Sequence, residues 1–165
     1  MSQVHYEVRD GVELSSLDGP LFDGAVVGQR AATKRDLVDY LDAVRHAILP
    51  ALADRPLSVV RVRPGQPPFM QKNLPKYTPD WVPRTKVWAE ASHREVTYGL
   101  CNDRRTLLWF ANQRAVEYHP TLMRAGDWAH PTYLILDLDP PDEAVVEVPG
   151  LINGYGVRGV SVGPL

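Results

Sequence analysis

The chain has 165 residues, 44% hydrophobic and 23% charged, so it is long enough to form one domain with a substantial core. Its formal net charge of −2 argues against a uniformly basic nucleic-acid binder, and its single cysteine excludes an internal disulfide and a cysteine-cluster zinc site. No apolar run is as long as a membrane span and the N-terminus lacks a signal-peptide core, so we expect a cytoplasmic protein with no membrane contact.

Basic residues are concentrated in the middle of the chain. Residues 1–29 contain five acidic residues and one basic residue, and residues 137–165 contain the same numbers. Residues 30–136 contain sixteen basic residues against ten acidic ones. Such an excess either attracts phosphate groups or belongs to an ordinary solvated surface, and charge alone leaves both interpretations open.

The first helix is indicated by "ATKRDLVDYLDAVRHAILP". Thr33 is placed to cap it, Asp36 completes a capping box, and Pro50 follows its expected end. The apolar residues expected on one face of this helix are Leu37, Leu41, Val44 and Ile48. The preceding residues 1–29 give weak signals, and "PLSVVRVRPG" then predicts a strand.

Residues 66–83, "QPPFMQKNLPKYTPDWVP", contain five prolines, which predicts an ordered loop. "TKVWAE" and "REVTYGL" predict two strands of a meander, and "NDRRTLLWFANQRAVEYHP" predicts a second helix capped by Asn102 or Asp103 and closed by Pro120. "TYLILDLD" has the pattern of a strand. The fold class expected is α+β, with a mixed or antiparallel sheet and two main helices.

The last segment differs in character from the rest. Residues 149–165 are glycine-rich, and they either form a last strand at "VRGVSV" or stay loosely ordered. We therefore divide the chain into a main region, residues 1–148, and an atypical tail, residues 149–165.

Two aspartates end the predicted strand at residues 132–139. Alternate side chains of a strand share a face, so Asp137 and Asp139 point the same way, and Pro140 and Pro141 prevent the strand from continuing. Two neighbouring carboxylates suit a hard divalent cation, which takes oxygen ligands. A solvent-facing pair, or a carboxylate that caps the next turn, is the alternative interpretation.

Three segments in order, "PPFMQKNLPKYTPDWV", "NDRRTLLWFANQRAVEYHP" and "YLILDLDPP", resemble the polymerase domain of bacterial ligase D. This is the archaeo-eukaryotic primase-like module of non-homologous end joining. The resemblance runs from about Thr33 to Pro141, and it implies that residues 1–148 form the N-terminal part of a primase-like fold. It also implies a nucleoid-associated bacterial protein.

By this resemblance, Asp137 and Asp139 form the first catalytic motif and hold Mn²⁺ or Mg²⁺ for nucleotidyl transfer. His119 falls where the family has a histidine near the incoming nucleotide; a histidine that caps a helix end is the alternative. The implied partners are DNA ends with a recessed or gapped primer-template and a nucleoside triphosphate.

The same resemblance implies a set of DNA contacts. Phe69 is similar to one of two aromatic residues that stack on template bases, and Met70 replaces the second. Lys72 resembles a lysine that contacts phosphate, with Arg84 as a weaker candidate. Lys34 could add a contact to the DNA backbone near a helix N-terminus.

The family pattern continues with a histidine motif and a third metal-binding aspartate, and neither follows "DLDPP" in this sequence. We therefore expect a shortened family member that is catalytically incomplete alone. A second chain could complete the fold, and Ku or a ligase could be a partner. The alternatives are a non-catalytic module that binds DNA ends or a partner, and a decayed reading frame.

Overall fold

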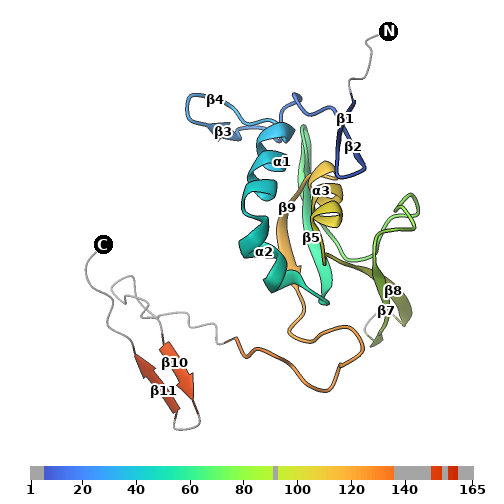
Figure 1. Cartoon of the computed structure of the whole chain (residues 1–165), viewed down its shortest axis with the longest axis vertical. Coiled ribbons are helices and arrows are strands. Elements are labelled where there is room, and N and C mark those ends of the chain that lie inside the picture. Colours follow the sequence, from blue (N-terminus) through green and yellow to red (C-terminus); the bar gives the residue numbers. More distant parts are fainter. Residues whose placement is uncertain (1–5, 91–92, 136–149, 154–155, 160–165) are drawn as a thin grey trace. The chain divides into compact units, whose positions relative to one another are not determined.

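A computed structural model describes residues 6–90, 93–135, 150–153 and 156–159 (Figure 1). The chain divides into two compact units, residues 1–134 and residues 135–165. Among the helices in the described ranges, none has the length and apolar character needed to cross a membrane.

Two short hairpins precede the first helix. Strands β1 (Tyr6–Arg9) and β2 (Val12–Ser15) pair around Asp10 and Gly11, whose φ angles of 50° and 72° suit a tight hairpin turn. Strands β3 (Val26–Val27) and β4 (Arg30–Ala31) form the second hairpin. Asp-Gly is a typical hairpin-turn sequence, and it was missed in a region, residues 1–29, whose signals for secondary structure are otherwise weak.

The predicted capping box of the first helix is confirmed. In α1 (Lys34–Ala43), the Thr33 hydroxyl accepts a bond from the Asp36 amide and the Asp36 carboxylate accepts one from the Thr33 amide. The helix ends earlier than predicted, because Val44 leaves helical geometry and α2 (Arg45–Leu52) starts anew with Pro50 inside it. Of the residues expected on the buried face, Leu41 is fully buried, together with Val38.

The main sheet is built around β5 (Pro56–Arg63), a strand that the sequence predicts correctly. One edge of β5 pairs with β9 (Ala115–Pro120), and the other pairs with β6 (Gln66–Gln71) and then β8 (Arg94–Leu100). Strand β7 (Arg84–Ala89) pairs antiparallel with β8, which confirms the predicted meander. All these pairings are antiparallel, in agreement with the α+β expectation.

The prediction of a loop for residues 66–83 was wrong for residues 66–71, which form β6. Pro67 and Pro68 stand in an edge strand, next to a register shift between Arg61 and Arg63 of β5. Prolines remove ladder hydrogen bonds, but an edge strand with an irregular register tolerates them.

The second helix is also shorter than predicted. Helix α3 (Arg104–Asn112) is capped by Asp103, whose carboxylate accepts a bond from the Thr106 amide. Arg114 has a φ of 61°, a left-handed conformation that ends the helical path and turns the chain into β9. The segment up to Pro120 is therefore a strand and not the end of a helix.

A strand was predicted at residues 132–139, but the described part of this segment, residues 132–135, forms no strand. Tyr133, Leu134 and Ile135 are exposed and belong to no strand, and the rest of that segment lies outside the described residues. In the second unit, β10 (Gly150–Asn153) and β11 (Gly156–Gly159) form an antiparallel hairpin, so part of the glycine-rich tail is ordered.

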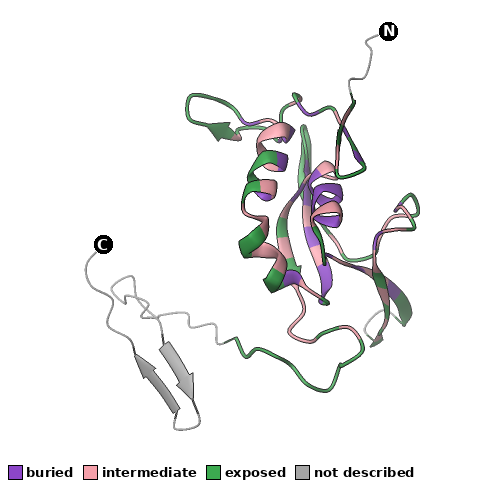
Figure 2. Cartoon of the chain, in the orientation of Figure 1, coloured by how far each residue is buried: buried purple, intermediate pink, exposed green. Residues whose placement is uncertain are grey.

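The core of the first unit lies between the three helices and the sheet (Figure 2). Its central residues are Val38, Leu41, Leu52, Leu57, Val59, Leu107, Leu108 and Phe110. The β1–β2 hairpin joins this core through Val12 and Leu14, and Asn112 bonds to the backbone of β2. The sheet, the helices and the N-terminal hairpin thus form one packed body. This body holds the paired strands β5 and β6 in place.

The close approach of β8 to α3 gives a test of this packing. A Cβ added at Gly99 would lie 2.8 Å from Cζ of Phe110, which is fully buried. Gly99→Ala should therefore lower the free energy of unfolding by about 1–3 kcal/mol through overpacking, measured by urea denaturation. Gly19→Ala is the matched control, because its Cβ would meet Ser16 O at 3.4 Å; equal effects of the two changes would contradict the packing.

Candidate nucleic-acid interface

An aromatic ring and two arginines meet where β5 and β6 pair. Phe69 of β6 stands opposite Arg61 of β5, and its ring is exposed. The guanidinium carbons of Arg61 and Arg63 lie 5.5 Å and 5.7 Å from the centre of this ring. Both distances fit cation–π contacts. Lys72 is exposed directly after the end of β6, so two predicted contact residues, Phe69 and Lys72, lie on β6 and on the residue that follows it.

Arg61 is a buried cation held by neutral partners, with 6% of its surface exposed. Its Nε donates to the Gln113 carbonyl at 2.7 Å, and Nη1 donates to Gln71 Oε1 at 2.6 Å and to the Tyr77 hydroxyl at 3.1 Å. Nη2 donates to Gln113 Oε1 at 3.1 Å. These bonds fix the orientation of the guanidinium and compensate in part for its burial, but no carboxylate among the described residues neutralises its charge.

Lys34 is buried, whereas a direct contact to the DNA backbone would need an exposed side chain. It is only 4% exposed, and its Nζ donates to the Ser15 carbonyl at 2.6 Å. Burial, followed by the nearby charges of Arg114 and Arg61, lowers the pKa of Lys34 to about 8. Lys34 is therefore an interior charge at the N-terminus of α1.

Arg114 completes a group of four cations. Its Nη1 donates to the Pro20 and Leu21 carbonyls at 2.6 Å and 2.8 Å, and burial, with the charge of Arg63, lowers its pKa. We call Lys34, Arg61, Arg63 and Arg114 the cation cluster. Within the part of the chain that the structure describes, none of the four forms an ion pair with a carboxylate. Such a cluster attracts anions.

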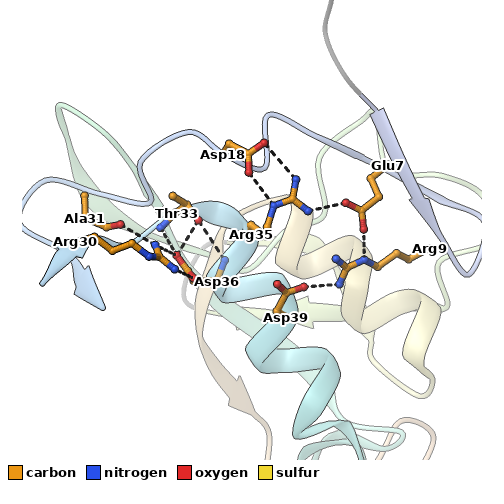
Figure 3. A network of polar contacts seen from close by, with 9 residues as sticks. All are labelled: Glu7, Arg9, Asp18, Arg30, Ala31, Thr33, Arg35, Asp36 and Asp39. Carbon is orange, nitrogen blue, oxygen red and sulfur yellow. Dashed lines mark hydrogen bonds and ion pairs between the residues drawn. The ribbon is translucent and has the colours of Figure 1, made fainter. Parts of the chain in front are cut away.

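The other basic residues around α1 are paired, as Figure 3 shows. Arg35 bridges Asp18 at 2.7 Å and Glu7 at 2.6 Å, and Glu7 also binds Arg9 at 2.5 Å. These bonds connect β1 and the segment after β2 to α1. Glu7 and Asp18 are thus paired with Arg9 and Arg35 and not with the cation cluster.

A second pairing stabilises the first turn of α1 and links it to β4 (Figure 3). Arg30 binds Asp36 at 2.5 Å, and Asp36 also accepts bonds from Thr33. The Arg30 guanidinium and the Thr33 donors hold the pKa of the Asp36 carboxyl well below its usual range. The turn that carries Lys34 is therefore fixed on both sides by neutralised charges.

Two predicted contact residues lie apart from this region. His119 is exposed on β9, where Nε2 meets Glu117 Oε2 at 3.0 Å. Arg84 lies on β7, which is separated from β5 by β8, and it donates to the Val82 and Pro79 carbonyls at 3.2 Å and 2.6 Å. Arg84 therefore closes the turn before β7, and nothing in the described contacts joins it to Phe69.

The two aspartates of the predicted metal site, Asp137 and Asp139, lie outside the described residues. Among the described residues, no group of three or more histidine, cysteine, aspartate or glutamate side chains could hold a metal ion.

Arg61 and Arg114 were not among the site residues predicted from the sequence. Arg61 continues the every-second-residue series of the core residues Leu57 and Val59 along β5, and this spacing was a usable signal for an inward-facing cation. Arg114 gave no usable signal, because it was expected inside a helix.

Comparison with known proteins adds family information to this geometry. Residues 33–152 match the family described as LigD, primase-polymerase domain. The chain is 31% identical over 160 residues to the bifunctional non-homologous end joining protein LigD of Bacillus subtilis, covering 91% of this chain and 24% of the relative. It is 30% identical over 112 residues to the multifunctional non-homologous end joining protein LigD of Mycolicibacterium smegmatis, covering 66% of this chain and 14% of the relative.

A solved structure has a similar fold. The polymerase domain from Mycobacterium tuberculosis ligase D in complex with DNA matches with a TM-score of 0.61 and 30% sequence identity. The match covers 68% of this chain and 38% of that chain. The chain thus spans well under half the length of each of these proteins.

The buried position of Lys34 predicts a specific pH dependence. A lysine whose pKa falls from 10.5 to about 8 on folding weakens the folded state while it is charged. The stability of the wild type relative to Lys34→Met should therefore rise between pH 8 and pH 10.5, by up to about 3 kcal/mol. Urea unfolding across this range measures the difference.

Lys86→Met is the control for this experiment, because Lys86 is an exposed lysine on β7. The free energy of unfolding of Lys86→Met should differ from that of the wild type by the same amount at every pH. Parallel curves for the wild type and Lys34→Met would contradict the burial of the ammonium group.

Proposed function

Because this chain belongs to the LigD primase-polymerase domain family, we propose that it binds DNA ends through Phe69, Lys72 and the cation cluster. The observation that carries this proposal is a set of four cations without carboxylate partners beside an exposed aromatic ring, within the described residues. The preferred substrate is a duplex with a recessed or gapped primer-template, in the cytoplasm of a bacterium. The chain acts in end joining, together with a ligase or Ku.

The cation cluster suits phosphate groups for an electrostatic reason. Phosphates neutralise the cations, which otherwise repel one another, and binding releases counterions from the DNA. Arg63 and Lys72 are exposed and can touch phosphate oxygens directly. Lys34 and Arg61 add positive potential from below the surface. Lys34 thus contributes through its charge and not as the direct contact predicted from the sequence.

Phe69 supplies a contact of a different kind. An exposed ring stacks on a base at a strand end, a contact of about 1–3 kcal/mol per base in other proteins. The neighbouring residue, Met70, is also exposed but belongs to the opposite face of β6. A single ring therefore stacks on one base, so the contact is weaker than with two aromatic residues.

Asp137 and Asp139 are proposed to hold Mn²⁺ or Mg²⁺, because neighbouring carboxylate oxygens suit hard divalent ions. Such an ion would stabilise negative charge on a transferring phosphoryl group. His119 is proposed to lie near the incoming nucleoside triphosphate, where its exposed ring can donate a hydrogen bond to a phosphate oxygen. These three residues are the proposed catalytic half of the site.

A second candidate function is a non-catalytic module that binds DNA ends or a partner protein. It is favoured by the chemistry of Phe69, Lys72 and the cation cluster, which can contact bases and phosphates without a metal ion. Binding to DNA then needs no metal, and this separates the two functions experimentally.

The binding proposal is tested with a recessed-end duplex by fluorescence anisotropy at several salt concentrations. Lys72→Ala should weaken binding and reduce the slope of log K against log salt by about one, because one phosphate contact is lost. Lys86→Ala is the control, since it removes an exposed lysine of β7, which is paired with Glu95 of β8 at 2.7 Å. Equal slopes for the wild type and Lys72→Ala would overturn the assignment of Lys72.

Catalysis is tested separately by incubating the purified chain with Mn²⁺, a nucleoside triphosphate and the same duplex. Nucleotide incorporation that is lost in Asp137→Ala, while DNA binding without metal is retained, would show that the chain is catalytic on its own, against the expectation that it is incomplete alone. Binding without any incorporation by the wild type would favour the non-catalytic module instead.

A further inference from the structure

The β3–β4 hairpin and the segment before it carry apolar side chains that are exposed and do not pack in the core. It projects from the N-terminal end of α1 (Figure 1). Val26 is 69% exposed and Val27 is 46% exposed, and Phe22, in the segment that leads into β3, is exposed as well. Contiguous exposed apolar residues on a soluble protein commonly mark a binding surface.

The base of this hairpin is firmly packed. Leu21 and Ala32 are buried together with Val62 of β5, and the Leu21 amide donates to the Ala32 carbonyl at 2.8 Å. The Ala32 amide donates to the Ala25 carbonyl at 2.8 Å. The exposed valines are therefore presented by a fixed support.

The hairpin stands directly beside the cation cluster. Arg114 of the cluster bonds to the Pro20 and Leu21 carbonyls at the base of the hairpin. Asp23 accepts a hydrogen bond of 2.8 Å from the Gly65 amide, which lies in the turn between β5 and β6. The hairpin is thus tied to the strand pair that carries Arg63 and Phe69.

We propose that Phe22, Val26 and Val27 contact the unpaired bases of a single-stranded overhang at a DNA end. This inference rests on the proposed function, since the phosphates of that DNA occupy the adjacent cation cluster. Apolar side chains beside phosphate-binding cations contact the faces of unstacked bases or wedge between them. The hairpin therefore extends the interface beyond the Phe69 ring and favours ends with an overhang over blunt ends.

Charge favours DNA over a second copy of the chain as the occupant. The hairpin adjoins the four cations of the cluster and one carboxylate, that of Asp23, so the local charge is positive. A second copy would bring the same positive charge to it, whereas DNA brings phosphates. Strands β3 and β4 are also only two residues long, which is too short to extend a sheet across an interface.

The test measures the affinity of the whole chain for three duplexes by fluorescence anisotropy: blunt, with a 5′ overhang and with a 3′ overhang. The wild type should bind at least one overhang duplex more tightly than the blunt one. The double variant Val26→Ser, Val27→Ser should lose about tenfold in affinity for that duplex, which corresponds to the burial of about one valine side chain, and should bind the blunt duplex unchanged.

Val8→Ser is the matched control for Val26→Ser, because Val8 is 63% exposed on the other hairpin, on strand β1. Val8→Ser should leave the affinity for all three duplexes unchanged, and urea unfolding should show equal stability for all variants. A double variant that keeps the full preference for the overhang would overturn this inference, as would a loss of affinity that is equal for blunt and overhang duplexes.

Two further outcomes separate this inference from the proposed function. If the wild type binds none of the duplexes, the proposed function itself fails. If sedimentation shows a wild-type dimer that the double variant dissociates, the hairpin is a contact between copies of the chain and this inference is overturned.

Discussion

The structure depends on a buried guanidinium whose partners are all neutral. Arg61 lies within a sheet strand, and its hydrogen bonds to Gln71, Tyr77 and Gln113 engage all three of its nitrogens without cancelling its charge. A buried charge is costly unless something compensates for it. Hydrogen bonds compensate in part, and an anion at the adjacent surface would compensate further. The DNA phosphates that we propose to bind beside Phe69 would supply this further compensation.

The distribution of charge over the rest of the first unit supports this interpretation. Carboxylates from the N-terminal segments neutralise Arg9 and Arg35, and Asp36 neutralises Arg30. These ion pairs are exposed and individually weak, but together they order the start of α1 and with it Lys34. The net negative charge of the chain therefore coexists with a local cationic surface, because acidic residues are placed elsewhere.

The family, the fold class and the elements with strong local signals could be predicted from the sequence. The cap at Thr33, strand β5 and the β7–β8 meander are examples. The turn at Arg114 could not be predicted, because the stretch around it keeps a helical spacing of apolar residues while one left-handed residue redirects the chain. Strand β6 was missed because its prolines oppose a strand in isolation, and the edge position that tolerates them is a tertiary property. The burial of Lys34 likewise depends on Ser15, which lies far away in the sequence.

The central claim is that the buried charge of Arg61 serves a nucleic-acid ligand, and a single substitution tests it most directly. The measurement is the affinity of Arg61→Gln for a recessed-end duplex across salt concentrations, made where unfolding curves show the variant to be folded. The account predicts an affinity about tenfold lower than wild type, with a shallower salt dependence. A folded variant with the wild-type affinity and salt slope would contradict it.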